Sequence, residues 1–103
     1  MLDYIKSAAE VQAEAADAHK RRVTRAIDRH VEDQAHALEY NSAAHLAGYA
    51  TSTVTEWQAE AQKFVQWRDD VWQAAIGLLG NADPSDPPSV EDVIAALPDW
   101  PDA

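Results

Sequence analysis

Apolar residues recur at helical spacing in the first third of the chain. They are separated by three or four positions, which is the spacing of one face of an α-helix. The face consists of Val23, Ile27, Val31, Ala35 and Leu38. Neither glycine nor proline interrupts residues 2–38, although the first half is alanine- and acid-rich and has a weaker apolar pattern. We therefore predict one long helix, or two nearly continuous helices, over residues 2–38.

A turn and a short helix follow this segment. Residues 39–42 form the expected turn, and either Asn41 or Ser42 can cap a helix over residues 42–50 by accepting from its free N–H groups. The connector at residues 51–55 is rich in β-branched and hydroxyl side chains. It is compatible with a strand, but an isolated strand is not stable without a partner, so we expect a non-helical link.

The central helix is predicted over residues 55–79, with Thr55 or a neighbouring hydroxyl residue as its cap. Its apolar positions cover more than half of the helix circumference, which is typical of a helix buried on two sides. The preceding helices can cover one side, and the C-terminal segment or another chain must cover the other. Gly80 suits the left-handed position just past a helix end.

The C-terminal segment combines a rigid linker with a short helix. Prolines make residues 81–88 non-helical, Ser89 is a good N-cap for a helix over residues 89–97, and Pro98 stops that helix. The tail contains Trp100, which either folds back onto the protein or is held out for a partner.

The predicted fold class is all-α. The chain has 103 residues, which favours one compact unit, and its scarcity of glycine and late placement of proline favour helix over strand. We divide it into a helical domain, residues 1–80, and a C-terminal part, residues 81–103, that holds the linker, the short helix and the tail.

The net charge of the chain disfavours some classes of binding partner. The net charge is −10, with 18 acidic and 8 basic residues, which argues against general nucleic-acid binding and against adsorption to anionic membranes. Five of the basic residues lie between Lys20 and Arg29, where a solvated face or a contact with acidic protein is expected. No secretory signal and no run of ~20 apolar residues are visible, so we expect a soluble, cytosolic protein.

No pattern of catalytic or ligating residues is visible. The four histidines do not share a helix face at metal-ligand spacing, the paired carboxylates are adjacent residues that point apart, and the three glycines are isolated. Cysteine is absent. We therefore expect no catalytic, metal or cofactor site and no enzyme activity.

Aromatic residues are the candidates for function. The segment from Trp67 to Trp72 is either an aromatic core with a charged rim or a partner surface anchored by tryptophan and arginine, which are enriched in interaction hot spots. Arg68 can stack on Trp72, and Asp69 can pair with Arg68 or with the basic segment. The candidate partner-binding residues are Trp57, Phe64, Trp67, Arg68, Trp72 and Trp100.

The segments around these residues resemble a known protein family. Phe64–Trp72 (FVQWRDDVW) followed by Pro88–Pro98 (PSVEDVIAALP) resembles the closing segment of small tailed-phage and prophage tail proteins of the tail-fibre assembly or accessory type. Shorter upstream runs are also similar, so that the resemblance extends from Val23 to Pro98. The chain departs from the pattern in its Ala- and Asp-rich linker and in its long helix before Val23.

The resemblance implies a chaperone-like factor in phage tail or tail-fibre assembly, without enzyme activity. Its partner would be a tail or tail-fibre protein, and it would act in the host cytoplasm. A structural component of the virion tail or fibre is the alternative. A homo-oligomeric helical bundle unrelated to phage is a third hypothesis.

Overall fold

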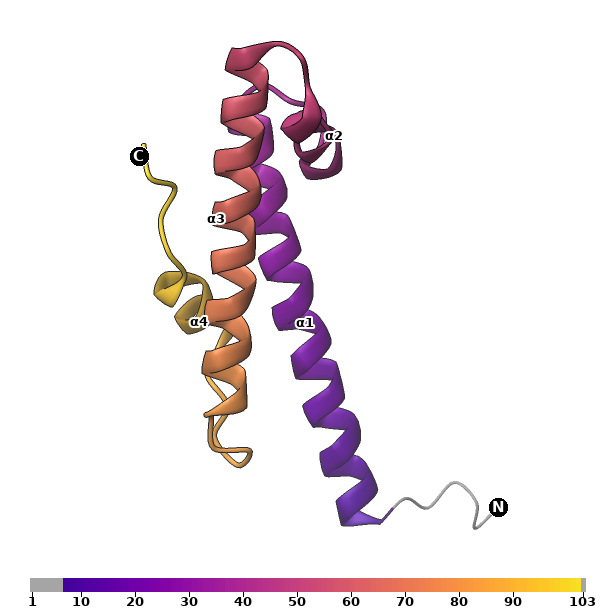
Figure 1. Ribbon diagram of the computed structural model, residues 1–103. Coiled ribbons are helices and arrows are strands. Elements are labelled where there is room, and N and C mark those ends of the chain that lie inside the picture. The colour runs from indigo at the N-terminus through magenta and orange to yellow at the C-terminus, as the bar shows by residue number, and fades with distance from the viewer. Residues whose placement is uncertain (1–6, 103) are drawn as a thin grey trace, which may run out of the picture.

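The computed structural model describes residues 7–102, which form four α-helices and one 3₁₀ turn (Figure 1). The elements are α1 (Ala8–Ala37), α2 (Ala43–Gly48), η2 (Tyr49–Thr51), α3 (Thr55–Gly80) and α4 (Val90–Ala96). The all-α prediction is confirmed, with a long N-terminal helix and a short C-terminal one. The first positions of the predicted 2–38 helix lie outside the described residues.

Two long helices set the shape of the molecule. α1 and α3 run side by side in opposite directions, α2 and η2 lie near one end of this hairpin, and α4 lies against its flank (Figure 1). The extents are 62 × 28 × 19 Å and the radius of gyration is 17.9 Å, against about 13 Å for a compact 100-residue domain. The molecule is elongated because α1 continues beyond the end of α3.

The core lies between the two long helices and under α4. The stripe predicted on the first helix is buried at Val23, Ile27, Val31 and Ala35, while Leu38 is half-buried. The other elements contribute the remaining buried side chains, namely Leu46, Ala61, Phe64, Trp67, Val71, Ala75, Val93, Leu97 and Trp100. Burial of this apolar area, at roughly 25 cal/mol per Å², is the main force that holds the hairpin together.

Serine hydroxyls cap the two short helices. Ser42 Oγ accepts from the backbone N–H of His45 at 2.9 Å, and Ser89 Oγ accepts from that of Asp92 at 3.0 Å. The cap predicted at either Asn41 or Ser42 thus lies at Ser42, and the cap predicted at Ser89 is confirmed. A side chain from α1 adds to the first cap, because Glu32 Oε2 accepts from the N–H of Ala43 at 3.1 Å.

The central helix begins at the predicted residue, but the predicted hydroxyl cap is wrong. Thr55 is the first helical residue, and Val54 occupies the N-cap position without a side-chain hydrogen bond. The hydroxyl of Ser52 instead accepts from the N–H of Val54 at 3.0 Å. The N–H of Val54 thus finds its hydrogen-bond acceptor within the bend before α3, and the helix begins without a hydroxyl cap.

The predicted left-handed backbone conformation of Gly80 is also wrong. Gly80 is still part of α3, and the helix ends at Asn81 in a right-handed conformation whose N–H bonds to the carbonyl of Gly77 at 3.1 Å. Within residues 7–102, the positive φ belongs instead to Glu39, at 73°. The N–H of Glu39 bonds to His36 O at 2.9 Å and that of Tyr40 to Ala35 O at 3.0 Å, which is the Schellman pattern of a helix end.

Candidate functional site

The six candidate partner-binding residues fall into three different environments. Phe64, Trp67 and Trp100 are buried together, with ring centroids 5.7–6.3 Å apart. Trp67 is 3% exposed and Trp100 is 8% exposed. Trp100 thus folds back, and these three rings are covered by the chain itself.

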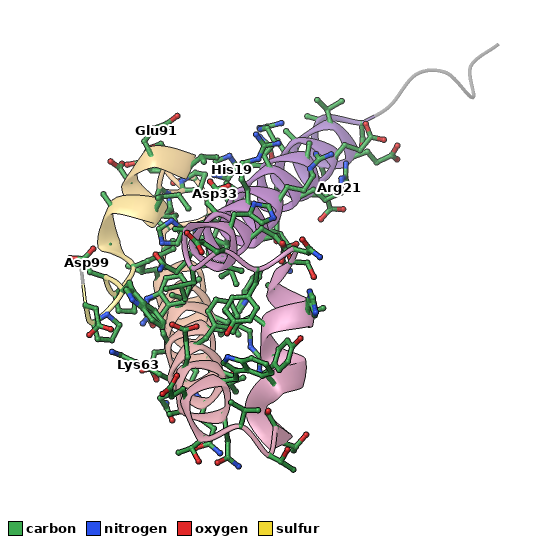
Figure 2. The ribbon with its side chains drawn as sticks, turned by 90° about the horizontal axis from the view of Figure 1, so that it is seen from above. His19, Arg21, Asp33, Lys63, Glu91 and Asp99 are labelled. Atoms are coloured by element: carbon green, nitrogen blue, oxygen red, sulfur yellow. The ribbon has the colours of Figure 1, made fainter. Side chains whose placement is uncertain are left out.

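Polar contacts hold the tail over these rings. The indole N–H of Trp67 donates to the carbonyl oxygen of Pro98 at 2.9 Å. The ammonium of Lys63 lies 5.4 Å from the ring centroid of Trp100 and forms an ion pair with Asp102. The linker is held to α1 through His19, whose Nε2 lies 2.8 Å from the carbonyl oxygen of Pro88 (Figure 2). The C-terminal segment therefore covers the part of α3 that carries Phe64 and Trp67, while other apolar residues of α3, such as Ile76, stay exposed.

Arg68 and Trp72 are half-buried at the edge of this core. Both Nε and Nη2 of Arg68 donate to Asp69 Oδ1, at 3.1 and 3.0 Å, as one of the predicted pairings requires. No cation–ring contact joins Arg68 to Trp72 in the part of the chain that the structure describes. The guanidinium is thus held at the surface by its neighbour.

Trp57 differs from the other tryptophans because 49% of its surface is exposed. It lies near the start of α3 and meets Tyr49 edge-on, with centroids 5.7 Å apart and planes at 79°. Of the six candidates, Trp57 presents the most open aromatic face to a partner.

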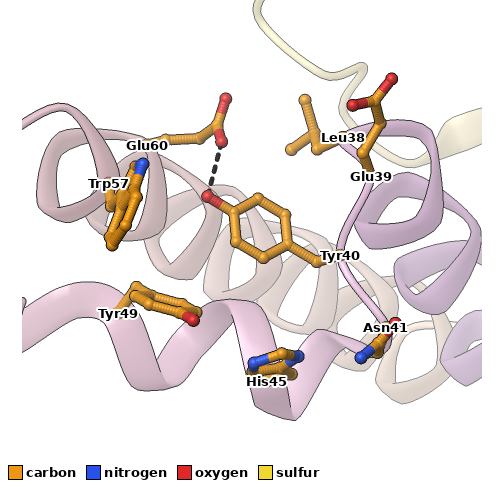
Figure 3. A pocket seen from close by; sticks show the side chains of 8 residues that line it. All are labelled: Leu38, Glu39, Tyr40, Asn41, His45, Tyr49, Trp57 and Glu60. Carbon is orange, nitrogen blue, oxygen red and sulfur yellow. Dashed lines mark hydrogen bonds between the residues drawn. The ribbon is translucent and has the colours of Figure 1, made fainter.

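Trp57 forms one wall of a pocket of about 380 Å³, here called the aromatic pocket (Figure 3). Its residues come from the end of α1, the following turn, α2, η2 and α3. They are Leu38, Glu39, Tyr40, Asn41, His45, Tyr49, Trp57 and Glu60. Sequence reasoning identified Trp57 alone as a site residue, because the other rings are separated along the chain and share no helical period.

Tyr40 holds its phenolic proton more tightly than a free phenol does. Its hydroxyl donates to Glu60 Oε1 at 2.8 Å. Burial, followed by the hydrogen bond and the negative charge of Glu60, raises the pKa of Tyr40 to about 12. The phenol remains a donor under neutral conditions, and it orients the Glu60 carboxylate beside the rings.

A second hollow, here called the α1–α3 groove, has a volume of about 1130 Å³. The alanine-rich half of α1 forms one wall, the end of α3 forms another, and residues 82–85 and 87 of the linker close one side. Ile76 lines the groove and is 67% exposed, and Leu79 lines it beside the alanines Ala13 and Ala16. The groove is therefore an open apolar surface.

The rims of the α1–α3 groove carry opposite charges. Lys20 lies on the α1 side, and Asp83 lies on the linker side. The Oγ and N–H of Ser85 donate to Asp83 Oδ1 at 2.7 and 2.9 Å, and these bonds hold the pKa of the Asp83 carboxyl below its usual value. A segment lying in the groove would meet a positive edge and a negative edge.

Across residues 7–102, no three histidine, aspartate or glutamate side chains are grouped so that they could hold a metal ion. None of the described helices has the length and apolar character needed to span a membrane.

Comparison with known proteins gives no relative: the chain matches no protein-family model, and no curated protein or solved structure is significantly similar to it.

Proposed function

We propose that the protein is a chaperone-like assembly factor for the tail or tail fibre of a tailed phage, acting in the host cytoplasm. The observation that supports this role is the open α1–α3 groove, where exposed Ile76 and half-buried Leu79 line an apolar surface together with small alanine side chains. Exposed apolar surface of this kind, rimmed by polar residues, is typical of protein-interaction sites.

The proposed occupant is an amphipathic helix of the partner. Small side chains let two helices approach closely, and an amphipathic helix can lay its apolar face into such a groove. The charges of Lys20 and Asp83 require a partner helix with an acidic edge toward α1 and a basic edge toward the linker.

The resemblance to tail-fibre assembly proteins supports the class of partner. The segments that carry it, Phe64–Trp72 and Pro88–Pro98, supply Phe64, Trp67, Val71, Val93 and Leu97 to the core. The shared motif is thus tied to the way α4 packs on the hairpin. Partner choice then depends on exposed residues outside the motif's buried positions, such as Ile76.

Co-expression with a phage tail-fibre protein tests the proposal. The protein should raise the yield of soluble, trimeric fibre, and Ile76→Asp should abolish the gain because it places a charge in the groove. Leu78→Asp is the matched control, since Leu78 is an exposed apolar residue of α3 that does not line the groove. Fibre yield that is indifferent to the protein, or equal effects of the two substitutions, would contradict the proposal.

A structural component of the virion tail or fibre is the second candidate. The elongated shape supports it, because the aromatic pocket and the α1–α3 groove lie at separate places along the hairpin and could contact two neighbours at once. Quantitative mass spectrometry of purified particles distinguishes the two functions. A fixed copy number in particles favours the structural role, whereas abundance in the lysate and absence from particles favours the assembly factor.

A further inference from the structure

We propose that the aromatic pocket binds a basic side chain of a polypeptide, with the guanidinium or ammonium group of an arginine or lysine placed among Tyr40, Tyr49, Trp57 and Glu60. This inference goes beyond the proposed function and concerns a different surface from the α1–α3 groove.

The ring arrangement suits a cation. Tyr40 and Tyr49 have centroids 5.7 Å apart with planes inclined at 56°, and Trp57 meets Tyr49 nearly at a right angle. Figure 3 shows Trp57 and Tyr40 on opposite sides of an opening, with Tyr49 along its base. Faces of tryptophan and tyrosine attract a cation within about 6 Å of the ring centroid. Three such rings around one space make an aromatic cage.

The charges in the pocket favour the same ligand. Glu39 and Glu60 both line it, and the lining contains neither lysine nor arginine. The Tyr40 hydroxyl holds Oε1 of Glu60 at 2.8 Å, which keeps this carboxylate at the edge of the cage (Figure 3). A cation would be attracted both by the aromatic ring faces and by the negative carboxylates, whereas the carboxylates would repel an anion.

The site is held in place before any ligand arrives. The Schellman turn after α1 positions Tyr40, and the caps from Ser42 and Glu32 fix the start of α2. The amide Nε2 of Gln62 donates to the carbonyl oxygen of Ala50 at 3.2 Å, which ties η2 to α3. Binding to a preorganised site loses less conformational entropy.

A side chain is favoured over a small free cation because the pocket also has an apolar wall. Leu38 is half-buried beside the carboxylates, and Trp57 leaves half of its surface open. Arginine and lysine bury a methylene stem along apolar surface while their charged end stays in polar surroundings. Leu38 and Trp57 provide that surface.

The test is an NMR titration of the full chain, followed through the indole N–H signal of Trp57. The probes are N-acetyl-arginine amide and N-acetyl-lysine amide, with N-acetyl-glutamine amide as the uncharged control and tetramethylammonium as the small cation. Saturable shifts with the two basic probes, and none with the glutamine probe, are expected. Equal shifts with the glutamine probe would overturn the proposal, and a preference for tetramethylammonium would assign the pocket to a small free cation instead.

A charge variant and its matched control complete the test. Glu60→Gln keeps a hydrogen-bond acceptor for Tyr40 but removes the charge, so binding should weaken roughly threefold to fivefold, the size expected for one partly exposed charge pair. Glu56→Gln removes a carboxylate one turn away that does not line the pocket, so its affinity should equal that of the unmodified protein. Equal affinities of the two variants would contradict a role for Glu60 in the cage.

Discussion

The indole nitrogen of Trp67 donates a 2.9 Å hydrogen bond to the carbonyl oxygen of Pro98. This bond joins the middle of α3 to the residue at which the C-terminal segment turns away from α4. A buried tryptophan needs a partner for its N–H, and a proline that ends a helix leaves its carbonyl available. One contact therefore satisfies two groups and closes the chain over Phe64.

Substitution of Trp67 by phenylalanine should destabilise the protein by about 1–3 kcal/mol, because it removes the donor and leaves the Pro98 carbonyl without its partner. Urea denaturation measures the change. Trp72→Phe is the control, since Trp72 is half-buried and makes no side-chain hydrogen bond within residues 7–102. Equal losses in the two variants would show that ring size, not the hydrogen bond, sets the cost.

Truncation after Gly80 should expose Phe64 and Trp67, because α4 and Trp100 cover them. The tryptophan emission maximum should shift to longer wavelength and the melting temperature should fall. A chain that ends after Trp100 is the control and should keep the emission maximum of the complete protein. An unchanged emission maximum and melting curve for the shorter chain would contradict packing of α4 on α3.

Replacement of Glu39 by glycine should stabilise the protein by about 1 kcal/mol, because a residue with a Cβ is strained at φ 73° and glycine is not. The midpoint of chemical denaturation reports the gain. Glu39→Ala removes the same carboxylate but keeps the Cβ, so it should give no comparable gain. Equal gains would indicate that charge at Glu39, and not its backbone conformation, limits stability.

Stability should depend on pH through Tyr40 above pH 10. The pKa of this phenol in the folded protein, about 12, lies above its ordinary value of 10.0. The folded state therefore holds the proton more tightly, so the contribution is fully present below about pH 10 and is lost as the pH rises through 12.

Denaturation at a series of alkaline pH values measures this loss. Tyr40→Phe should remove the part of the slope that belongs to this group. The Tyr49→Phe variant leaves the hydrogen bond between Tyr40 and Glu60 in place and removes only the smallest of the causes that raise the Tyr40 pKa, so it should retain most of this slope. An unaltered slope in Tyr40→Phe would refute the assignment.

Local features of the sequence determined where the helices lie. The stripe through Val23, Ile27 and Val31, and the serine caps at Ser42 and Ser89, depend on residues within four positions of one another. Such interactions are the same in any tertiary arrangement, so periodicity and capping predict them. The start of α3 at residue 55 was predicted, but its hydroxyl cap was wrong, because Val54 takes the N-cap position and the hydroxyl of Ser52 bonds to the N–H of Val54 within the bend.

Only the tertiary structure decided which aromatic residues are covered. A helix that is apolar over most of its circumference does not indicate which side meets its own chain. The return of Pro98 and Trp100 along α3 buries Trp67, while Trp57 lies beyond their reach and stays open. The cage around Trp57 likewise requires the reversal at Glu39, where the packing of α2 against α1 and α3 outweighs the local preference of a glutamate for negative φ.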